Sequence, residues 1–256
     1  MSDQLRIVIL GAGNVATHLA LALFRAGFDI RQIYSRTYLN AQNLAKLLRA
    51  DCCDKLDAIQ HADVYLYALT DDALPAIVEK MPIKTGVHVH TAGSISINLL
   101  QNQFENCGVM YPLQTFSVTK AVELKSVPLF VESTTQQAEN VLSLLANRIS
   151  EKVYHVNSQQ RLELHISAVF ACNFSNYLYQ IAHGLLLKNG LPFELLLPLI
   201  DETAQKLHSM SPYDAQTGPA RRHDKLVVGK HIEQINDVKL KQLYALISNE
   251  ISTIYK

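Results

Sequence analysis

The strongest constraint on the fold lies near the start of the chain, where an apolar run leads directly into a glycine-rich turn. Leu5 to Leu10 reads LRIVIL, which is typical of a strand buried on both faces of a parallel sheet. GAGNVA follows at once, and Asn14 to about Ala26 reads as a helix that Gly27 closes. A buried strand, a glycine turn and a helix in this order predict the first unit of a doubly wound α/β sheet.

The same alternation of strands and helices continues to about residue 156. We predict further strands at Phe28 to Tyr34, Asp63 to Leu69, Gly86 to His90, Gly108 to Tyr111, Val127 to Val131 and Val153 to Val156, and helices at Ala41 to Leu48, Asp72 to Lys80 and Ala138 to Ala146. Residues 1–156 are therefore predicted to form a Rossmann domain.

No strand pattern follows residue 156. Ser158 to Leu187 reads as one long helix with Asn157 or Ser158 as its N-cap, another helix opens at Pro192, and the last begins near Asp237. Residues 157–256 are predicted to form a separate, all-helical domain.

Gly11, Gly13 and Ala16 form the pattern GxGxxA, which favours binding of a dinucleotide. Gly11 permits the tight turn, Gly13 lets a pyrophosphate approach the backbone, and Ala16 allows close packing of helix on strand. The helix N-terminus at Asn14 and Val15 offers free N–H groups to phosphate. The alternative is a glycine turn with a purely structural role.

The end of the second predicted strand indicates which dinucleotide binds. NAD-binding domains usually place Asp or Glu there, whereas this chain has Ser35 and Arg36. A guanidinium and a hydroxyl suit a 2′-phosphate, so we predict that the cofactor is NADP. The alternative is an exposed arginine on a loop.

Composition excludes several classes of protein. Hydrophobic residues make up 48% and charged residues 18%, which is globular, and 23 basic residues balance 23 acidic ones, so we expect no nucleic-acid partner. The most apolar long stretch, Gly184 to Ile200, contains charged residues and a proline, so we expect no membrane span. The four cysteines and the histidines lack metal-ligand spacing. We expect a cytoplasmic protein without a metal site.

Polar residues follow the predicted strands that end near residues 69 and 90. Thr70 and Asp71 follow the first of these strands, and His90, Thr91 and Ser94 lie at the end of the second. Ligands of open α/β sheets collect at this edge, so we expect Thr70, Asp71 and Thr91 at the cofactor. The alternative is that Thr91 and Ser94 cap the next helix. Tyr111 is a candidate for the same cleft or for the core.

One face of the first long helix carries a histidine and an amide among apolar residues. At 100° per residue, His165 and Asn176 lie within about 40° of each other, and Asn173 lies about 80° from His165. His165 is a candidate general acid, and Asn173 and Asn176 are candidates for holding substrate. The alternative is a buried helix whose polar groups bond to neighbouring backbone. A later loop carries Arg221 and Arg222, which either clamp a substrate carboxylate or lie in solvent before a helix capped by Asp224.

With these motifs in place, the chain resembles the 6-phosphogluconate dehydrogenase-like superfamily. It resembles most a branch of bacterial Rossmann-like NADP oxidoreductases with a helical C-terminal domain, some of them grouped with deazaflavin-dependent reductases, and more distantly pyrroline-5-carboxylate reductase. The resemblance rests on the segments HTAGS (His90 to Ser94), YPLQTFS (Tyr111 to Ser117), LHISAVFACNFSNYLY (Leu164 to Tyr179) and QTGPARRHD (Gln216 to Asp224).

Two departures limit what the resemblance implies. The superfamily's hydroxyacid dehydrogenases carry a catalytic lysine on the first long helix, where this chain has His165, Asn173 and Asn176. His223 stands where the branch leads us to expect glycine. Lysine-based chemistry is therefore not expected.

The resemblance and the motifs together predict an NADP-dependent oxidoreductase that transfers a hydride between the nicotinamide and a small keto, imino or hydroxy acid. The alternative is a non-catalytic dinucleotide-binding sensor or scaffold. Apolar segments such as Leu185 to Leu187 and Leu195 to Leu197 predict a homodimer through the helical domain.

Overall fold

The computed structural model describes residues 5–82, 84–117 and 120–256. Contacts divide the chain into two compact units, Met1–Tyr177 and Leu178–Lys256. All elements from residue 157 onward, a fully described stretch, are helical. The division nevertheless falls after Tyr177 rather than after residue 156, because the helix that begins at Ser158 packs on the sheet through Leu164.

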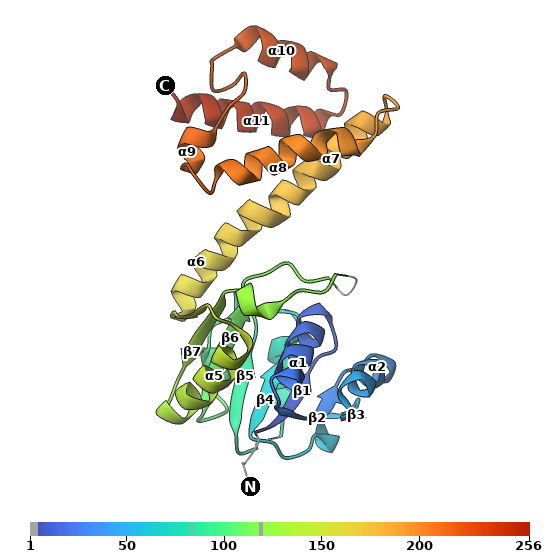
Figure 1. Cartoon of the computed structure of the whole chain (residues 1–256), viewed down its shortest axis with the longest axis vertical. Coiled ribbons are helices and arrows are strands. Elements are labelled where there is room, and N and C mark those ends of the chain that lie inside the picture. Colours follow the sequence, from blue (N-terminus) through green and yellow to red (C-terminus); the bar gives the residue numbers. More distant parts are fainter. Residues whose placement is uncertain (1–4, 83, 118–119) are drawn as a thin grey trace. The chain divides into compact units, whose positions relative to one another are not determined.

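The first unit is built on one sheet with the strand order β3-β2-β1-β4-β5-β6-β7-β8 (Figure 1). The strands are β1 (Arg6–Leu10), β2 (Asp29–Tyr34), β3 (Asp51–Cys53), β4 (Val64–Tyr67), β5 (Val87–His90), β6 (Cys107–Pro112), β7 (Leu129–Ser133) and β8 (Val153–His155). All neighbours are parallel except β6 and β7. The predicted α/β fold class, a doubly wound sheet followed by helices, is confirmed.

The strand order reverses at β1, since β2 lies on one side of it and β4 on the other. Ligands of such sheets bind in the crevice outside the carboxyl ends of the strands at this point. The turn at Gly11 and the segments after β4 and β5 meet this crevice, so the fold itself brings the predicted cofactor residues to one edge.

Helices cover both faces of the sheet (Figure 1). The first unit contains α1 (Asn14–Arg25), α2 (Tyr38–Leu48), α3 (Leu74–Lys80), α4 (Asn98–Gln101), α5 (Gln136–Ile149), α6 (Ser158–Ala168) and the 3₁₀ turns η1 (Leu56–Ala58) and η2 (Leu124–Ser126). Helices α1, α2 and α5 share one core with Ile7 and Ile9, and α3 and α4 share another with Val8 and Leu10. Successive β1 side chains from Ile7 to Leu10 therefore pack in opposite cores, which explains why these four residues are all apolar.

Helix α1 ends as predicted. Gly27 has a φ of +93°, and its N–H donates to the Phe24 carbonyl at 3.0 Å, while the Phe28 N–H donates to Leu23 at 3.1 Å. Glycine adopts this left-handed conformation at no steric cost, so it turns the chain from α1 into β2.

The predicted long helix from Ser158 to Leu187 is continuous but not uniform. It consists of α6, a π-helical segment η3 (Val169–Phe174) and α7 (Ser175–Leu187). Asn157 caps α6, since its side chain accepts the Gln160 N–H at 2.9 Å while the Gln160 side chain accepts the Asn157 N–H at 3.0 Å.

The second unit is helical throughout and buries little of its own apolar surface. It contains the later part of α7, then η4 (Phe193–Leu196), α8 (Leu197–Lys206), α9 (Pro212–Ala215), α10 (Lys225–Gln234) and α11 (Val238–Ile254). Ala220 is its one buried apolar side chain among residues 178–256. Within the part of the chain that is described, no helix has the length and apolar character that a membrane crossing needs.

Candidate cofactor and substrate site

The two glycines of the turn have different structural tasks. Gly11 has a φ of +124°, and a Cβ built on it would lie 2.1 Å from the Ala68 carbonyl oxygen. Its N–H donates to the Tyr34 carbonyl at 2.8 Å. A Cβ at Gly13, by contrast, would meet no atom within 4 Å. Gly11 is therefore required by the fold, whereas Gly13 leaves open space in front of α1.

That open space adjoins the N-terminus of α1. Gly13 is the N-cap and has no side chain to satisfy the N–H groups of the first turn, and the first helical bond is Thr17 N–H to Gly13 O at 2.9 Å. The Asn14 side chain instead donates to the Phe116 carbonyl at 3.0 Å, and Val15 lines the neighbouring cavity. An open approach to free helical N–H groups fits a pyrophosphate.

Ser35 and Arg36 lie directly beyond β2. Ser35 is half-buried, and its Oγ accepts the Thr37 N–H at 3.3 Å. Arg36 is exposed and forms no ion pair with any described residue. Burial raises the pKa of the adjacent Tyr34, and the positive charge of Arg36 opposes that rise. An unpaired guanidinium beside a hydroxyl at this edge fits a phosphate group.

A cavity of about 450 Å³ lies beside this turn, within the first unit. Its wall combines the first turn of α1, the segments after β4, β5 and β6, and the helical segment from α6 to η3. The polar and small residues that line it include Asp71, Thr91, Gly93, Tyr111, Gln114, Thr115, His165, Cys172 and Asn173, and Val15 contributes from α1. The structure thus brings His165, Asn173, Asp71, Thr91 and Val15 together, as residues of one cavity.

Two of the cavity residues are directly bonded. The Tyr111 hydroxyl and His165 Nδ1 are 3.0 Å apart, and the two rings meet edge-on with centroids 5.9 Å apart. Burial and the charge of Asp71 raise the pKa of Tyr111, while Arg161 acts in the opposite direction. Gly93 packs against the imidazole so closely that a Cβ would lie 2.7 Å from Nδ1. No side chain larger than hydrogen fits at position 93 with the ring in this place.

A buried ion pair fixes the helix that carries His165. Arg161 is 1% exposed, and its guanidinium donates to the Glu132 carboxylate on β7 and to the Ile95 carbonyl. Ser158 also donates to Glu132, at 2.9 Å. Since His165 follows Arg161 by four residues, it lies one turn further along the same helix face. The pair therefore sets the position of the imidazole over Gly93.

The π-helical segment decides which asparagine reaches the cavity. A π turn contains more residues than an α turn, so each residue in η3 advances by less than 100°. Residues beyond Val169 therefore rotate backward relative to the uniform helix that the sequence predicts. Asn173 comes onto the His165 side and lines the cavity, whereas Asn176 is exposed and does not line it. The expectation that Asn176 shares a face with His165 fails for this reason.

The remaining predicted residues lie around the cavity or away from it. Thr70 is exposed and does not line it, while Asp71 accepts a hydrogen bond from Ser94. Thr91 is buried and donates to the Tyr67 carbonyl at 3.4 Å.

His90 is fully buried, its Nδ1 accepts the Ala92 N–H at 3.2 Å, and burial lowers its pKa to about 3. Neither Thr91 nor Ser94 caps α4, whose N-cap is Ile97.

In the loop that was a candidate for clamping a substrate carboxylate, Arg221 and Asp224 form contacts within the second unit. Arg221 donates to the carbonyls of Asp214 and Gln216 and lies 4.9 Å over the Tyr255 ring. Asp224 caps α10 by accepting the Val227 N–H at 3.1 Å. His223, where glycine was expected, has a φ of +56°, and its Nε2 pairs with the Tyr255 carbonyl at 3.0 Å. The left-handed backbone explains the expectation of glycine at this position.

Sequence reasoning missed Gly93, Glu132 and Arg161 as residues that build the site. Arg161 had a detectable signal, since a charged residue one turn before His165 on a helix that packs on a sheet requires a buried partner. Glu132 and Gly93 had no such signal, because their importance depends on which strands are neighbours.

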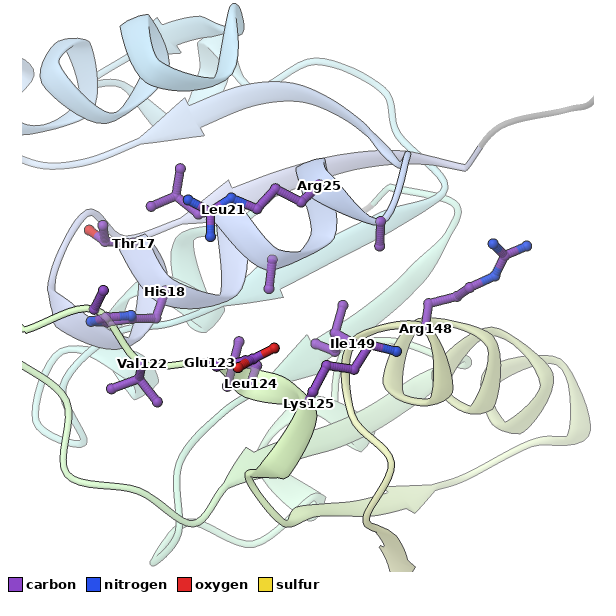
Figure 2. A pocket seen from close by; sticks show the side chains of 13 residues that line it. Thr17, His18, Leu21, Arg25, Val122, Glu123, Leu124, Lys125, Arg148 and Ile149 are labelled. Atoms are coloured by element: carbon purple, nitrogen blue, oxygen red, sulfur yellow. The ribbon is translucent and has the colours of Figure 1, made fainter.

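A larger cavity of about 640 Å³ contains none of the predicted site residues. Figure 2 shows it between α1 and α5, with Thr17, His18, Leu21 and Arg25 on one side and Val122 to Lys125, Arg148 and Ile149 on the other. Size therefore does not identify the site, and the smaller cavity is the candidate because it holds the bonded polar groups.

Two family models match the chain, and the first of them covers the glycine turn. Residues 6–97 match the family model described as "NADP oxidoreductase coenzyme F420-dependent", and residues 127–251 match a domain of unknown function, DUF2520. No curated protein matches the chain.

Solved structures extend the likeness to nearly the whole chain. A putative NADP oxidoreductase from Bacteroides fragilis is 42% identical, with 98% of each chain covered and a TM-score of 0.91. A 1-pyrroline-5-carboxylate reductase from Streptococcus pyogenes is 14% identical, covering 98% of this chain and 100% of its own, with a TM-score of 0.63. An imine reductase from Myxococcus stipitatus, solved in complex with NADP⁺, is 14% identical, covering 98% and 92%, with a TM-score of 0.64. The DUF2520 match includes β7 and β8 of the sheet and the helices that follow them. The last two structures share the fold, and the 42% identity to the Bacteroides fragilis protein shows that this chain belongs to a family of NADP oxidoreductases, in which the coenzyme F420-dependent type of domain precedes a DUF2520 domain.

Proposed function

We propose that the protein is an NADP-dependent oxidoreductase that transfers a hydride between the nicotinamide and a small carbonyl or imine compound. The observation that carries the proposal is one cavity that contains both Val15, from the glycine-turn helix, and the hydrogen-bonded Tyr111 and His165. The cavity borders the turn that would hold the cofactor, so a substrate bound in the cavity would lie beside it. The comparisons lend no support to the alternative, a non-catalytic sensor or scaffold.

The residues divide into cofactor-binding and substrate-binding groups. Gly13 and the first-turn N–H groups of Asn14 and Val15 would hold the pyrophosphate, and Ser35 with Arg36 would hold the 2′-phosphate. NADPH, when bound, supplies the hydride. His165 would supply the proton that a reduced carbonyl or imine requires, and Asn173 would orient the substrate.

The charge of the cavity narrows the substrate class. Asp71 is the one carboxylate among the residues that line the cavity, and no arginine or lysine is among them. A carboxylate substrate needs a cationic partner when it leaves water. We therefore favour a neutral or cationic C=O or C=N compound over a keto, imino or hydroxy acid for this cavity.

The cofactor assignment is tested by the Arg36→Ala variant. Fluorescence titrations should show that the wild-type protein binds NADPH about 10- to 150-fold more tightly than NADH, since a charge-assisted hydrogen bond contributes about 1.5–3 kcal/mol. Arg36→Ala should lose most of that preference and keep its affinity for NADH. Arg25→Ala, which removes an exposed arginine at the other end of α1, is the matched control and should change neither affinity. Equal affinities for both cofactors in the wild type would refute the assignment.

Turnover is tested with a panel of small ketones, aldehydes and imines, with NADPH oxidation followed at its absorbance maximum. The panel includes keto acids and a deazaflavin, because the description of the matching family model names that coenzyme. Turnover of neutral carbonyls or imines supports the substrate class, and turnover of keto acids alone contradicts it.

We also propose that the protein is a homodimer through its second unit. Large apolar side chains are exposed on α8 and α11, among them Leu199, which is 63% exposed, and Leu246. A helical unit with one buried apolar side chain lacks the core that such a unit needs to be stable alone. A second copy of the same unit supplies a matching apolar surface.

Light scattering tests this assembly. The wild type should have the mass of a dimer, about twice 28.6 kDa, at micromolar concentration, and Leu199→Glu should shift it toward the monomer. Leu47→Glu places the same charge at a similarly exposed leucine of α2 in the first unit and should leave the dimer intact. A monomeric wild type would refute the proposal.

A further inference from the structure

The hydrogen bond between Tyr111 and His165 can be made in two directions. The hydroxyl and Nδ1 are 3.0 Å apart, and with a neutral imidazole either the phenol donates to Nδ1 or Nδ1–H donates to the phenolic oxygen. The direction matters because it decides which proton is left to face the cavity. That proton belongs to His165 Nε2 in the first arrangement and to Tyr111 in the second.

Burial distinguishes the two arrangements. Tyr111 is 9% exposed, and its hydroxyl has no second partner among the described residues. If Nδ1–H were the donor, the phenolic O–H would have no acceptor among the described residues, and folded proteins avoid leaving a buried donor unpaired. Both residues line the cavity, but His165 is the more exposed, so its Nε2–H reaches water or substrate more readily than the largely buried phenol does. Burial and Asp71 also raise the pKa of Tyr111, so the phenol keeps its proton at neutral pH.

We propose that Tyr111 is a positioning residue that donates its O–H to His165 Nδ1 and thereby holds the neutral imidazole in the Nε2–H tautomer, with that N–H directed into the cavity. The use of this N–H rests on the proposed function, whereas the hydrogen bond and the tautomer do not.

The pair also balances the proton transfer. NADPH, when bound, would supply the hydride, and the oxygen or nitrogen of the C=O or C=N group would take the proton from His165 Nε2. The Tyr111 proton would move to Nδ1 in the same step, so the imidazole would stay neutral and the phenol would become a phenolate. The alkoxide or amide anion left by hydride addition is a stronger base than a phenolate, so this transfer is favourable although the pKa of Tyr111 is raised. Return of the Nδ1 proton to the phenolate, with a proton from water taken up at Nε2, restores the starting state.

Gly93 provides an independent way to disturb the pair. A Cβ at position 93 would lie 2.7 Å from His165 Nδ1 and 2.8 Å from its Cγ. Gly93→Ala therefore displaces the imidazole from Tyr111 without changing any ionisable group. Gly93 is buried and has no positive φ, so the methyl group acts on the ring rather than on the backbone.

The test is ¹⁵N NMR of the imidazole nitrogens in the full-length protein without cofactor. Wild-type His165 should show an unprotonated Nδ1 and a protonated Nε2 as a single tautomer. Tyr111→Phe and Gly93→Ala should each show a mixture of tautomers. Tyr154→Phe removes the hydroxyl of an exposed tyrosine on β8 and should leave the His165 signals unchanged.

Two outcomes overturn the proposal: a protonated Nδ1 together with an unprotonated Nε2 in the wild type, which makes Tyr111 the proton donor to the cavity, or an unchanged tautomer in Tyr111→Phe. If Tyr111→Phe does not fold, as judged by circular dichroism, the wild type and Gly93→Ala still decide the question. Where turnover is measured, Tyr111→Phe should lose part of the about 10²–10⁴-fold that a general acid contributes to kcat, with little change in KM. The NMR test uses no cofactor, so it can refute the tautomer proposal while the NADPH titrations still support the proposed function. The titrations can likewise refute the proposed function while the NMR test still supports the tautomer.

Discussion

The two glycines of the turn give the sharpest test of how this edge of the sheet is built, because they should respond to substitution in opposite ways. Gly11→Ala places a methyl group 2.1 Å from the Ala68 carbonyl oxygen and 2.9 Å from its carbon. Both are backbone atoms at the end of β4, which cannot rotate away as a side chain does. The φ of +124° also disfavours any residue with a Cβ.

The magnitude follows from these two effects. A residue forced into a glycine-only backbone region costs about 1–3 kcal/mol, and overpacking in a buried site costs about 1–3 kcal/mol. Gly11→Ala should therefore lower the free energy of unfolding by about 2–6 kcal/mol, a large part of the about 5–15 kcal/mol of a typical protein. At a urea m-value of about 2 kcal/mol/M, the midpoint should fall by about 1–3 M.

Gly13→Val should do the reverse. Gly13 has a φ of −87°, which any residue adopts, and its Cβ direction is empty. Stability should change by less than about 1 kcal/mol, since only the helix cap is affected. The branched side chain would, however, occupy the space in front of the α1 N–H groups, so binding of NADPH should be lost.

Urea unfolding followed by far-ultraviolet circular dichroism measures the first effect, and calorimetric titration with NADPH measures the second. Wild-type affinity for NADPH in Gly13→Val would refute the placement of the pyrophosphate. An unchanged urea midpoint in Gly11→Ala would refute the structural account of the turn.

Three further predictions concern stability, pH and catalysis. Arg161→Met leaves the largely buried Glu132 carboxylate without its charged partner and should lower the free energy of unfolding by about 3–5 kcal/mol in urea titrations; a loss below about 1 kcal/mol would contradict the anchoring role. His88 is buried with a pKa lowered to about 4, so the wild type should lose stability as pH falls below 6.5. Between pH 7 and 5, His88→Gln should lose about 2 kcal/mol less than the wild type, and parallel pH profiles would contradict this. If turnover is found, His165→Ala should lower kcat by about two to four powers of ten, and an unchanged kcat would leave His165 a structural role only.

Much of the first unit was predictable because its signals are local. A strand segment buried on both faces must be apolar at every position, so Ile7 to Leu10 identify β1 without knowledge of its neighbours, and Arg6 lies at its exposed start. The glycine turn, the C-cap at Gly27 and the N-cap at Asn157 likewise depend on residues within a few positions of each other. Strand β3 escaped prediction because Asp51–Cys53 is short and contains no β-branched or aromatic residue, unlike the equally short β8, which contains Val153 and Tyr154.

The candidate site was predictable as a set of residue types but not as an arrangement. Thr91 and Asp71 follow strands, and the rule that ligands bind at the carboxyl edge places them without a structure. The choice between Asn173 and Asn176 was not available, because a helix wheel assumes 100° per residue and the π-helical segment breaks that assumption. The catalytic and binding roles of these residues stay predictions.

The sequence by itself determined the elements, their order and the glycine turn, because each depends on the chemistry of neighbouring residues. Only the tertiary structure decided that Tyr111 meets His165, which lies 54 positions later, and that Arg161 meets Glu132 across 29 positions. These contacts depend on which strands are adjacent and on how α6 packs, and both follow from the balance of many burial and packing energies over the whole unit. Local sequence patterns do not contain that information. The sequence therefore indicated Tyr111 and His165 as candidates but did not predict that they form a hydrogen bond.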